Sequence, residues 1–163
     1  MVDGPELTDD GHHVVVGGRR WRTTDPSIPG PLAAELRSEL MAARRAVKDQ
    51  GDAARHRVQD AKVALGERGE PWWEPTDEGR RDRVEATIRA LLRHRDPDRT
   101  ICPSDAARVV GGERWRPWVA VARDVAAQLH AAGQVEVRQK GRRVDPDEAR
   151  GPVRIGRGPQ WTD

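Results

Sequence analysis

The sequence of 163 residues predicts an α+β fold in which short β-hairpins accompany a set of amphipathic helices. Two observations predict this fold class. Apolar residues recur at spacings of three and four in five segments, which is the period of an amphipathic helix. Glycine-containing turns separate β-prone runs near the beginning and the end of the chain, as they do in β-hairpins. The length suits one compact domain or two very small ones.

The first hairpin is predicted at residues 12–23, after a polar stretch at 1–11 that we expect to be a flexible N-terminus. A Gly-Gly pair between two β-prone runs indicates a two-residue turn. In the register that this turn sets, Val14 lies opposite Trp21. These two side chains share one face of the hairpin with Val16, and this is the face expected to contact the core.

Two helices are predicted next, at 31–49 and at about 52–65, and Gly51 separates them. The short connection favours an antiparallel helical hairpin, so residues 12–66 combine a β-hairpin with a helical hairpin. Residues 67–79 are rich in Pro, Trp and Gly and show neither a helical nor a strand period. They are predicted to link the two parts of the chain.

Three further helices are predicted from the same spacing, at about 80–95, 103–110 and 115–132. Residues 135–144 predict a second β-hairpin around a Lys-Gly turn. Two arginines lie directly opposite each other in this hairpin, an arrangement that destabilises strand pairing slightly. Residues 151–156 could add an edge strand.

Helix, short helix, long helix and hairpin, in this order, is the arrangement of a winged helix-turn-helix domain. The sequence predicts this domain for residues 80–158, followed by a tail at 159–163. In helix-turn-helix domains the second helix enters the major groove of DNA, and other contacts reach phosphates. The long helix presents arginines and small alanines away from its apolar stripe, and the hairpin would add cations as a basic wing. The residues predicted to bind nucleic acid are Arg116, Arg123, Arg138, Lys140, Arg142 and Arg143.

The charges are divided unevenly along the chain. Residues 1–78 carry 11 basic and 15 acidic residues, and residues 79–163 carry 18 and 12, which gives net charges of −4 and +6. A basic half indicates an anionic partner, although a solvated arginine-rich surface explains it equally well. The leading hypothesis is therefore a non-enzymatic protein that binds nucleic acid, DNA in preference to RNA, with a regulatory role in transcription as one outcome.

The alternative hypothesis is a protein–protein interaction adaptor, because one fold can serve many functions. Trp72 and Trp73 lie between prolines in the linker and could anchor a partner, since Trp is enriched at binding hot spots. They could equally fasten the linker between the two parts of the chain. A homodimer is a further open alternative, because many helix-turn-helix readers dimerise.

No catalytic, cofactor or metal site is predicted. Cys102, the single cysteine, precedes Pro103 at a helix start, where a small buried residue or a cap is expected rather than a nucleophile. The histidines and Cys102 show no zinc-binding spacing, and no phosphate-binding glycine motif occurs. The sequence contains no apolar run long enough to span a membrane and no signal peptide, so a cytoplasmic protein is expected.

Several short motifs carry a resemblance in the C-terminal part. They are Ile-Cys-Pro-Ser-Asp at 101–105, Trp115-Arg116, Gln139-Lys140-Gly141, Val144-Asp145-Pro146 and Gly-Pro-Val-Arg-Ile at 151–155. With these motifs, the segment resembles a bacterial winged-helix family known only as a domain of unknown function. The resemblance implies the fold and brings no activity. The motif Ala-Leu-Gly-Glu-Arg-Gly at 64–69, followed by paired Trp, is similar to short actinobacterial proteins of unknown function. Those typically carry Gly-Pro before the pair, where this chain has Gly69-Glu70-Pro71.

Overall fold

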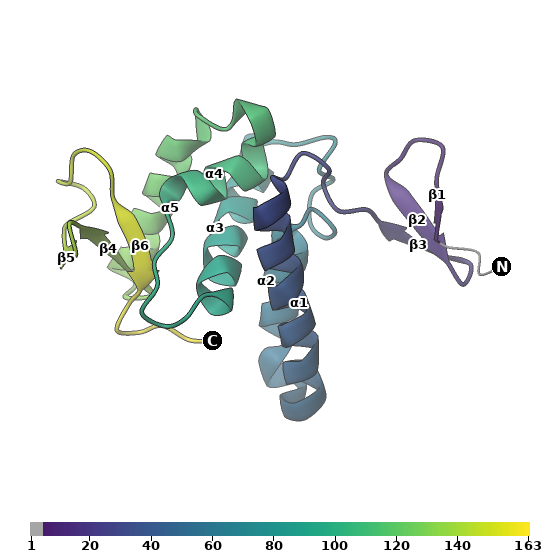
Figure 1. The fold of residues 1–163 in the computed structure, drawn as a ribbon, viewed down its shortest axis with the longest axis horizontal. Coiled ribbons are helices and arrows are strands. Elements are labelled where there is room, and N and C mark those ends of the chain that lie inside the picture. The colour runs from purple at the N-terminus through teal and green to yellow at the C-terminus, as the bar shows by residue number, and fades with distance from the viewer. Residues whose placement is uncertain (1–4) are drawn as a thin grey trace.

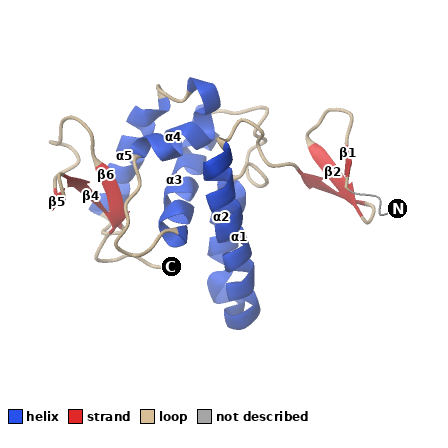
Figure 2. Cartoon of the chain, viewed as in Figure 1, coloured by secondary structure: helices blue, strands red, loops and turns tan. Residues whose placement is uncertain are grey.

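A computed structural model describes residues 5–163 and shows a mixed α and β architecture (Figure 1). Two small antiparallel sheets lie at opposite ends of the long axis, and the helices form the body between them (Figure 2). The N-terminal sheet has the order β1-β2-β3 and consists of β1 (Glu6–Leu7), β2 (His13–Val16) and β3 (Arg19–Arg22). The C-terminal sheet has the order β5-β4-β6 and consists of β4 (Val135–Gln139), β5 (Arg142–Arg143) and β6 (Arg154–Arg157).

The register predicted for the first hairpin is confirmed. Val14 pairs with Trp21 and Val16 pairs with Arg19, and both glycines of the connecting turn have positive φ. Such a turn follows the right-handed twist of the strands.

Two features of this region differ from the expectation. Glu6–Leu7, expected within a flexible N-terminus, pair with β2 as β1, while residues 1–4 lie outside the described part of the chain. The predicted core face is wrong, because Val16 and Trp21 keep 51% and 41% of their surface exposed. The reason is that the N-terminal sheet extends away from the helical body on a connector at residues 23–29 (Figure 1).

The predicted helices are present, with small shifts at their ends. The elements are α1 (Gly30–Gln50), the 3-10 turn η1 (Gly51–Ala54), α2 (Arg55–Ala64), α3 (Asp77–His94), α4 (Pro103–Gly111), the 3-10 turn η2 (Gly112–Arg114) and α5 (Trp118–Ala131). Helix α3 starts earlier than expected because the Thr76 hydroxyl accepts a hydrogen bond from the Gly79 amide and caps it. Helix α5 starts later because Pro117 lacks the amide proton needed to continue a helix toward its N-terminus.

One hydrophobic core runs through both parts of the chain. Leu36 of α1 and Leu65 belong to the same buried cluster as Ile88 of α3, Val125 of α5 and Ile155 of β6. The helical hairpin of α1 and α2 therefore packs on the C-terminal part through shared apolar side chains.

Arginine–carboxylate pairs also join the two parts. Arg83 Nη1 lies 2.9 Å from Asp25 Oδ2, and Asp25 is only 5% exposed. Burial lowers the pKa of the Arg83 guanidinium, and the Asp25 carboxylate acts against that shift. Arg95 binds both oxygens of Glu35, at 2.8 and 3.0 Å, and these hydrogen bonds raise the pKa of Arg95.

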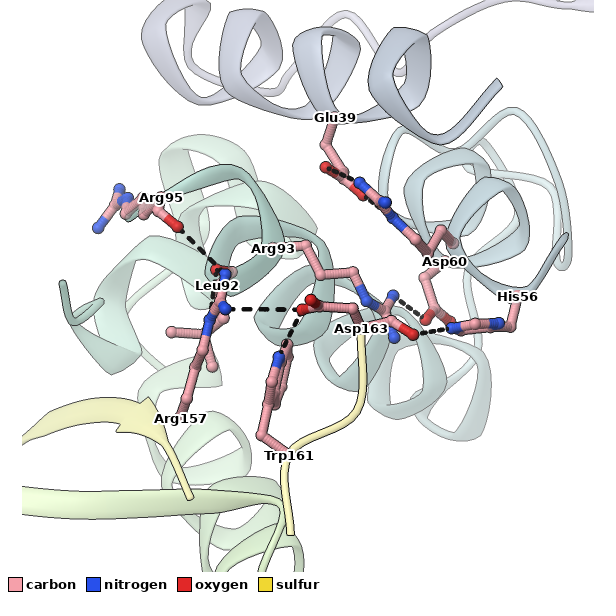
Figure 3. A network of polar contacts seen from close by, with 10 residues as sticks. Glu39, His56, Asp60, Leu92, Arg93, Arg95, Arg157, Trp161 and Asp163 are labelled. Atoms are coloured by element: carbon pink, nitrogen blue, oxygen red, sulfur yellow. Dashed lines mark hydrogen bonds and ion pairs between the residues drawn. The ribbon is translucent and has the colours of Figure 1, made fainter. Parts of the chain in front are cut away.

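The last residues of the chain return to the helices. Arg93 of α3 is ion-paired with Asp60 of α2, and the Trp161 ring lies beside both Arg93 and Arg157 (Figure 3). The Trp161 indole donates to Asp163 Oδ1 at 2.9 Å, and the main-chain oxygen of Asp163 contacts the His56 ring. The segment predicted as a tail is thus docked along α2 and α3.

Candidate nucleic-acid interface

Helix α4 is fixed at its first turn by a reciprocal cap. The Cys102 amide donates to Asp105 Oδ2 at 3.0 Å, and Arg95 lies 3.5 Å from the same oxygen. Ser104 donates to the Cys102 sulfur at 2.9 Å. Cys102 is therefore the N-cap of α4, one of the two structural roles expected for it. The helix packs against α5.

Helix α5, the predicted reader, uses its central arginine internally. Arg123 donates to the carbonyl oxygens of Gly151 at 2.7 Å and Ala149 at 3.1 Å. The guanidinium thereby fastens the loop between β5 and β6 onto α5. Its neighbour Asp124 is ion-paired with Arg81 at 2.6 Å. Among the predicted binding residues, Arg123 is thus the one whose guanidinium donates to main-chain carbonyl groups of this chain, those of Gly151 and Ala149.

The wing has the register that its turn predicts. Arg138 lies opposite Arg143, and the turn between the strands has positive φ at Lys140 and Gly141. The repulsion expected between the two arginines is relieved by Glu136, which accepts from Arg138 at 3.1 Å and lies 4.0 Å from Arg143. Lys140, Arg142 and Arg143 are exposed, whereas Arg138 is partly neutralised by Glu136.

A second group of cations lies around the turn between α4 and α5, with Arg108 on α4 and Arg114 and Arg116 in the turn. The guanidinium carbons of Arg108 and Arg116 lie 4.6 and 4.9 Å from the centroid of the Trp115 ring. We call these three residues the arginine–tryptophan stack. Arg114 is exposed in the same turn. Cation–π contacts of this kind hold a guanidinium in place and leave its edge available to an anion.

Sequence reasoning identified Arg116 in this turn and missed Arg108 and Arg114. Arg108 lies on α4, seven residues before Trp115, so no single helical face unites the group. The signal available in the sequence was the run of three basic residues around one Trp between positions 108 and 116. That run points to a cluster only if α4 and α5 are known to meet at this turn.

The paired tryptophans join the N-terminal sheet to the loop before α3. The Trp72 indole donates to the Thr23 carbonyl at 3.1 Å. The His12 ring stacks on Trp73 with centroids 3.9 Å apart, and Arg22 donates to the Gly69 carbonyl at 2.9 Å. Both indoles are half-buried by these contacts. The geometry favours the fastening role that the sequence left open beside partner binding.

Part of the charge difference between the two halves is cancelled by ion pairs inside the molecule. Three arginines of the basic half, Arg83, Arg93 and Arg95, pair with Asp25, Asp60 and Glu35 of the acidic half. Setting these three pairs aside changes the net charges from −4 and +6 to −1 and +3. The positive charge available to an external partner is therefore about half of the sequence total for this half of the chain.

Two surface hollows lie beside the wing and beside the start of α5. One, of about 330 Å³, runs beside the wing and is lined by Arg138, Gln139, Lys140, Pro152, Val153 and Arg154. The other, of about 460 Å³, lies where α3 and α5 begin, between Glu78 and the apolar side chains of Trp118 and Val121.

Within residues 5–163, no three His, Cys, Asp or Glu side chains are grouped so as to hold a metal ion. Among the described helices, none combines the length and apolar character needed to cross a membrane.

Residues 81–158 match a family model described as a protein of unknown function (DUF3253). The matched segment begins in α3, contains α4 and α5, and ends just after β6. A domain of unknown function in the C-terminal part is thereby confirmed. The comparison with curated proteins found no match.

Proposed function

We propose that residues 80–158 form a winged-helix domain that binds nucleic acid mainly through its phosphates. The observation that carries the proposal is where exposed cations remain after the internal pairs are set aside. One group is on the wing, and the other lies on α4 and in the turn that follows it. The six residues are Lys140, Arg142 and Arg143 on the wing, and Arg108, Arg114 and Arg116 at the turn.

The order of the elements supports the winged-helix part of the proposal. Helices α3, α4 and α5 are followed directly by the β4–β5 hairpin, and β6 pairs with the other edge of β4. Arg123 ties the loop after the wing to α5, so the wing and the helix are held in a fixed relation. This arrangement would let the two groups of cations meet one nucleic-acid backbone together.

The surface of α5 favours phosphate contacts over base readout. Its exposed positions include Ala120 and Ala131, and its acidic Asp124 is held by Arg81. Its exposed Gln128 lies in the last turn, away from the N-terminal residues through which a recognition helix contacts bases. Base recognition in the major groove depends on bidentate donors and acceptors such as Arg, Asn and Gln. With Arg123 occupied, we expect weak discrimination among sequences and affinity that depends strongly on salt.

The test is a fluorescence-anisotropy titration of the full-length protein with labelled random-sequence duplex DNA. If about four cations contact phosphates, the logarithm of the affinity should fall with the logarithm of salt at a slope near −3.6 between about 50 and 200 mM. The double variant Arg142→Gln/Arg143→Gln should make this slope shallower by about 2, because two phosphate contacts are removed. Structured RNA titrated in parallel would reveal the preferred nucleic acid.

Arg20→Gln is the matched control, since Arg20 is an exposed arginine of the N-terminal sheet, at the far end of the molecule (Figure 1). It should leave the salt slope unchanged. Absence of binding at the lower salt concentration, or an unchanged slope in the wing variant, would overturn the proposal.

A further inference from the structure

The N-terminal sheet exposes an apolar face. Leu7 of β1 pairs with Val14 of β2, which pairs with Trp21 of β3, so the three side chains form one row across the strands. Val16 lies two residues from Val14 on the same face. Leu7, Val16 and Trp21 are 62%, 51% and 41% exposed, and they are three of the four most exposed large apolar side chains in the described chain.

A contiguous face of this kind usually marks a contact surface. Single exposed apolar residues are common, whereas grouped ones occur at interaction sites. Short sheets such as this one are also marginal alone, and they gain stability when their apolar face is covered. The pattern that predicts a core-facing hairpin is thus present, and the helices of the same chain leave it exposed.

Cations surround the row at Trp21. The Arg19 guanidinium carbon and the Lys62 Nζ lie 4.4 and 5.3 Å from the centroid of the Trp21 ring. Burial lowers the pKa of Lys62, and repulsion by Arg68 and Arg44 lowers it further. These groups are therefore close enough to crowd one another, with Glu67 as the acidic group acting on Lys62 in the opposite direction.

A groove between α1 and α2 continues this surface. It has a volume of about 300 Å³, and its apolar lining comes from Val47 and Val58. Its polar lining consists of arginines, namely Arg44, Arg55 and Arg68. Arg44 and Arg68 belong both to the groove and to the cations that act on Lys62, so the groove and the sheet share a basic border.

The basic border has a structural origin. Four carboxylates of the N-terminal half, those of Asp25, Glu35, Glu39 and Asp60, turn inward and bind arginines. Glu39, for example, is 1% exposed and holds Arg57 at 3.0 Å (Figure 3). Three of these four carboxylates bind arginines of the other half, which reduces the net charge of residues 1–78 from −4 to −1 and leaves Arg44, Arg68 and Lys62 together beside α1 and α2.

We propose that the apolar row of the N-terminal sheet and its basic border bind a partner protein through a segment that alternates aliphatic and acidic residues. Aliphatic side chains would cover Leu7, Val14 and Trp21, and carboxylates would pair with the surrounding cations. In an extended segment, residues two apart share a face, so the aliphatic side chains can lie along the row together. The long side chains of Arg19 and Lys62, which lie beside Trp21, would reach the carboxylates from the edge of the row.

The chemistry of the face disfavours other occupants. Two copies of the same face would bring like charges together, which costs free energy at an interface. Single-stranded nucleic acid is bound by a basic groove together with several aromatic rings on which successive bases stack. This row offers one aromatic ring, and Arg19 and Lys62 already lie against it.

The experiment uses the full-length protein and a labelled peptide of about 12 residues that alternates Leu and Glu, matched with Ser/Glu and Leu/Lys peptides. Only the Leu/Glu peptide should raise its fluorescence anisotropy on binding. Leu7→Ser and Lys62→Glu should each weaken that binding at least about tenfold, which corresponds to 1.4 kcal/mol. Leu7 is the most exposed member of the row, so its replacement is compatible with folding, which circular dichroism would verify.

Arg142→Glu is the matched charge-reversal control, and it separates this proposal from nucleic-acid binding by the wing. It should weaken duplex binding and leave peptide binding unchanged. Equal binding of the Ser/Glu peptide would overturn the proposal, because charge alone would then explain the affinity. Self-association that Leu7→Ser abolishes, or oligothymidylate binding that Lys62→Glu abolishes, would also overturn it by assigning the face to a second copy or to nucleic acid.

Discussion

The two three-stranded sheets have the same antiparallel construction and opposite surroundings. In the C-terminal sheet, Val135, Val137 and Ile155 are at most 2% exposed and belong to the main core. In the N-terminal sheet, Leu7 and Trp21 keep 62% and 41% of their surface exposed, and Val14 between them is half-buried. Both sequences alternate in the way that gives a strand one apolar face. Alternation therefore identifies the apolar face of each sheet, but it does not determine whether the helices cover that face.

The connections to the helices explain the difference. A short turn at residues 132–134 joins α5 to β4, and Ile155 also bridges to Ile101 before α4. The C-terminal sheet is thus held against the helices at several points. The N-terminal sheet leaves the body on the connector at 23–29 and is held mainly by polar and aromatic contacts with Trp72 and Trp73 (Figure 1).

The largest expected effect is a difference between the two sheets in how much one apolar side chain contributes to the free energy of unfolding. Ile155→Ala should lower the free energy of unfolding by about 2–5 kcal/mol, because it leaves a cavity beside fully buried neighbours. Leu7→Ala should change it by less than about 0.5 kcal/mol, since the side chain is already solvated. Urea denaturation followed by far-UV circular dichroism measures both. Similar losses in the two variants would contradict the comparison.

A smaller, local effect is expected where the N-terminal sheet meets the body. Trp73→Ala removes the ring on which His12 stacks at 3.9 Å. The amide protons of β2 and β3 should then exchange at least about tenfold faster, while those of α3 and α5 keep their protection. Hydrogen exchange followed by NMR or mass spectrometry resolves the two regions.

Trp161→Ala is the control for this measurement, because Trp161 lies beside Arg93 of α3 and Arg157 of β6, at the side of the molecule away from the N-terminal sheet (Figure 1). It should leave β2 and β3 unchanged. If Trp73→Ala accelerated exchange throughout α3 and α5 as well, the N-terminal sheet would be part of the cooperative core.

Local chemistry explains why much of the fold could be predicted. The Gly-Gly turn sets the register of Val14 with Trp21, and the Lys-Gly turn does the same for Arg138 and Arg143. Each turn fixes its pairing within a few residues. Helix positions follow similarly from apolar spacing, with Thr76 and Pro117 accounting for the shifts at the starts of α3 and α5.

Whether a charged side chain pairs inside the molecule or faces outward depends on contacts between distant positions, which the spacing of apolar residues does not predict. Arg123 meets carbonyl oxygens 26 and 28 residues away, and the partner of Arg83 lies far earlier in the chain, at Asp25. The sequence-based candidate site therefore included Arg123 and omitted Arg108. A basic half was visible in the sequence, whereas the share of it facing outward became visible only in three dimensions.

The smallest expected effect compares one acidic residue near each sheet. Burial raises the pKa of Glu67, against the influence of Lys62 and Arg44, so the folded protein holds this proton more tightly than the unfolded chain does. The resulting stabilisation is present below the ordinary Glu pKa and is lost as pH rises through the higher folded pKa. Glu67→Gln should therefore raise the free energy of unfolding slightly at pH 7, and this gain should vanish below about pH 4.

Glu136→Gln provides the opposite case in the C-terminal sheet. Glu136 accepts from Arg138 and lies near Arg143, so its loss should leave two facing arginines uncompensated and cost less than about 1 kcal/mol. Urea denaturation at pH 7 and at pH 4 compares the two variants. A stability loss at pH 7 in Glu67→Gln as well would mean that the cations beside the N-terminal sheet depend on Glu67, and that a carboxylate is already supplied from within the chain. Opposite signs would mean that burial outweighs the attraction of Lys62 and Arg44 at Glu67, whereas the attraction of the arginines prevails at Glu136.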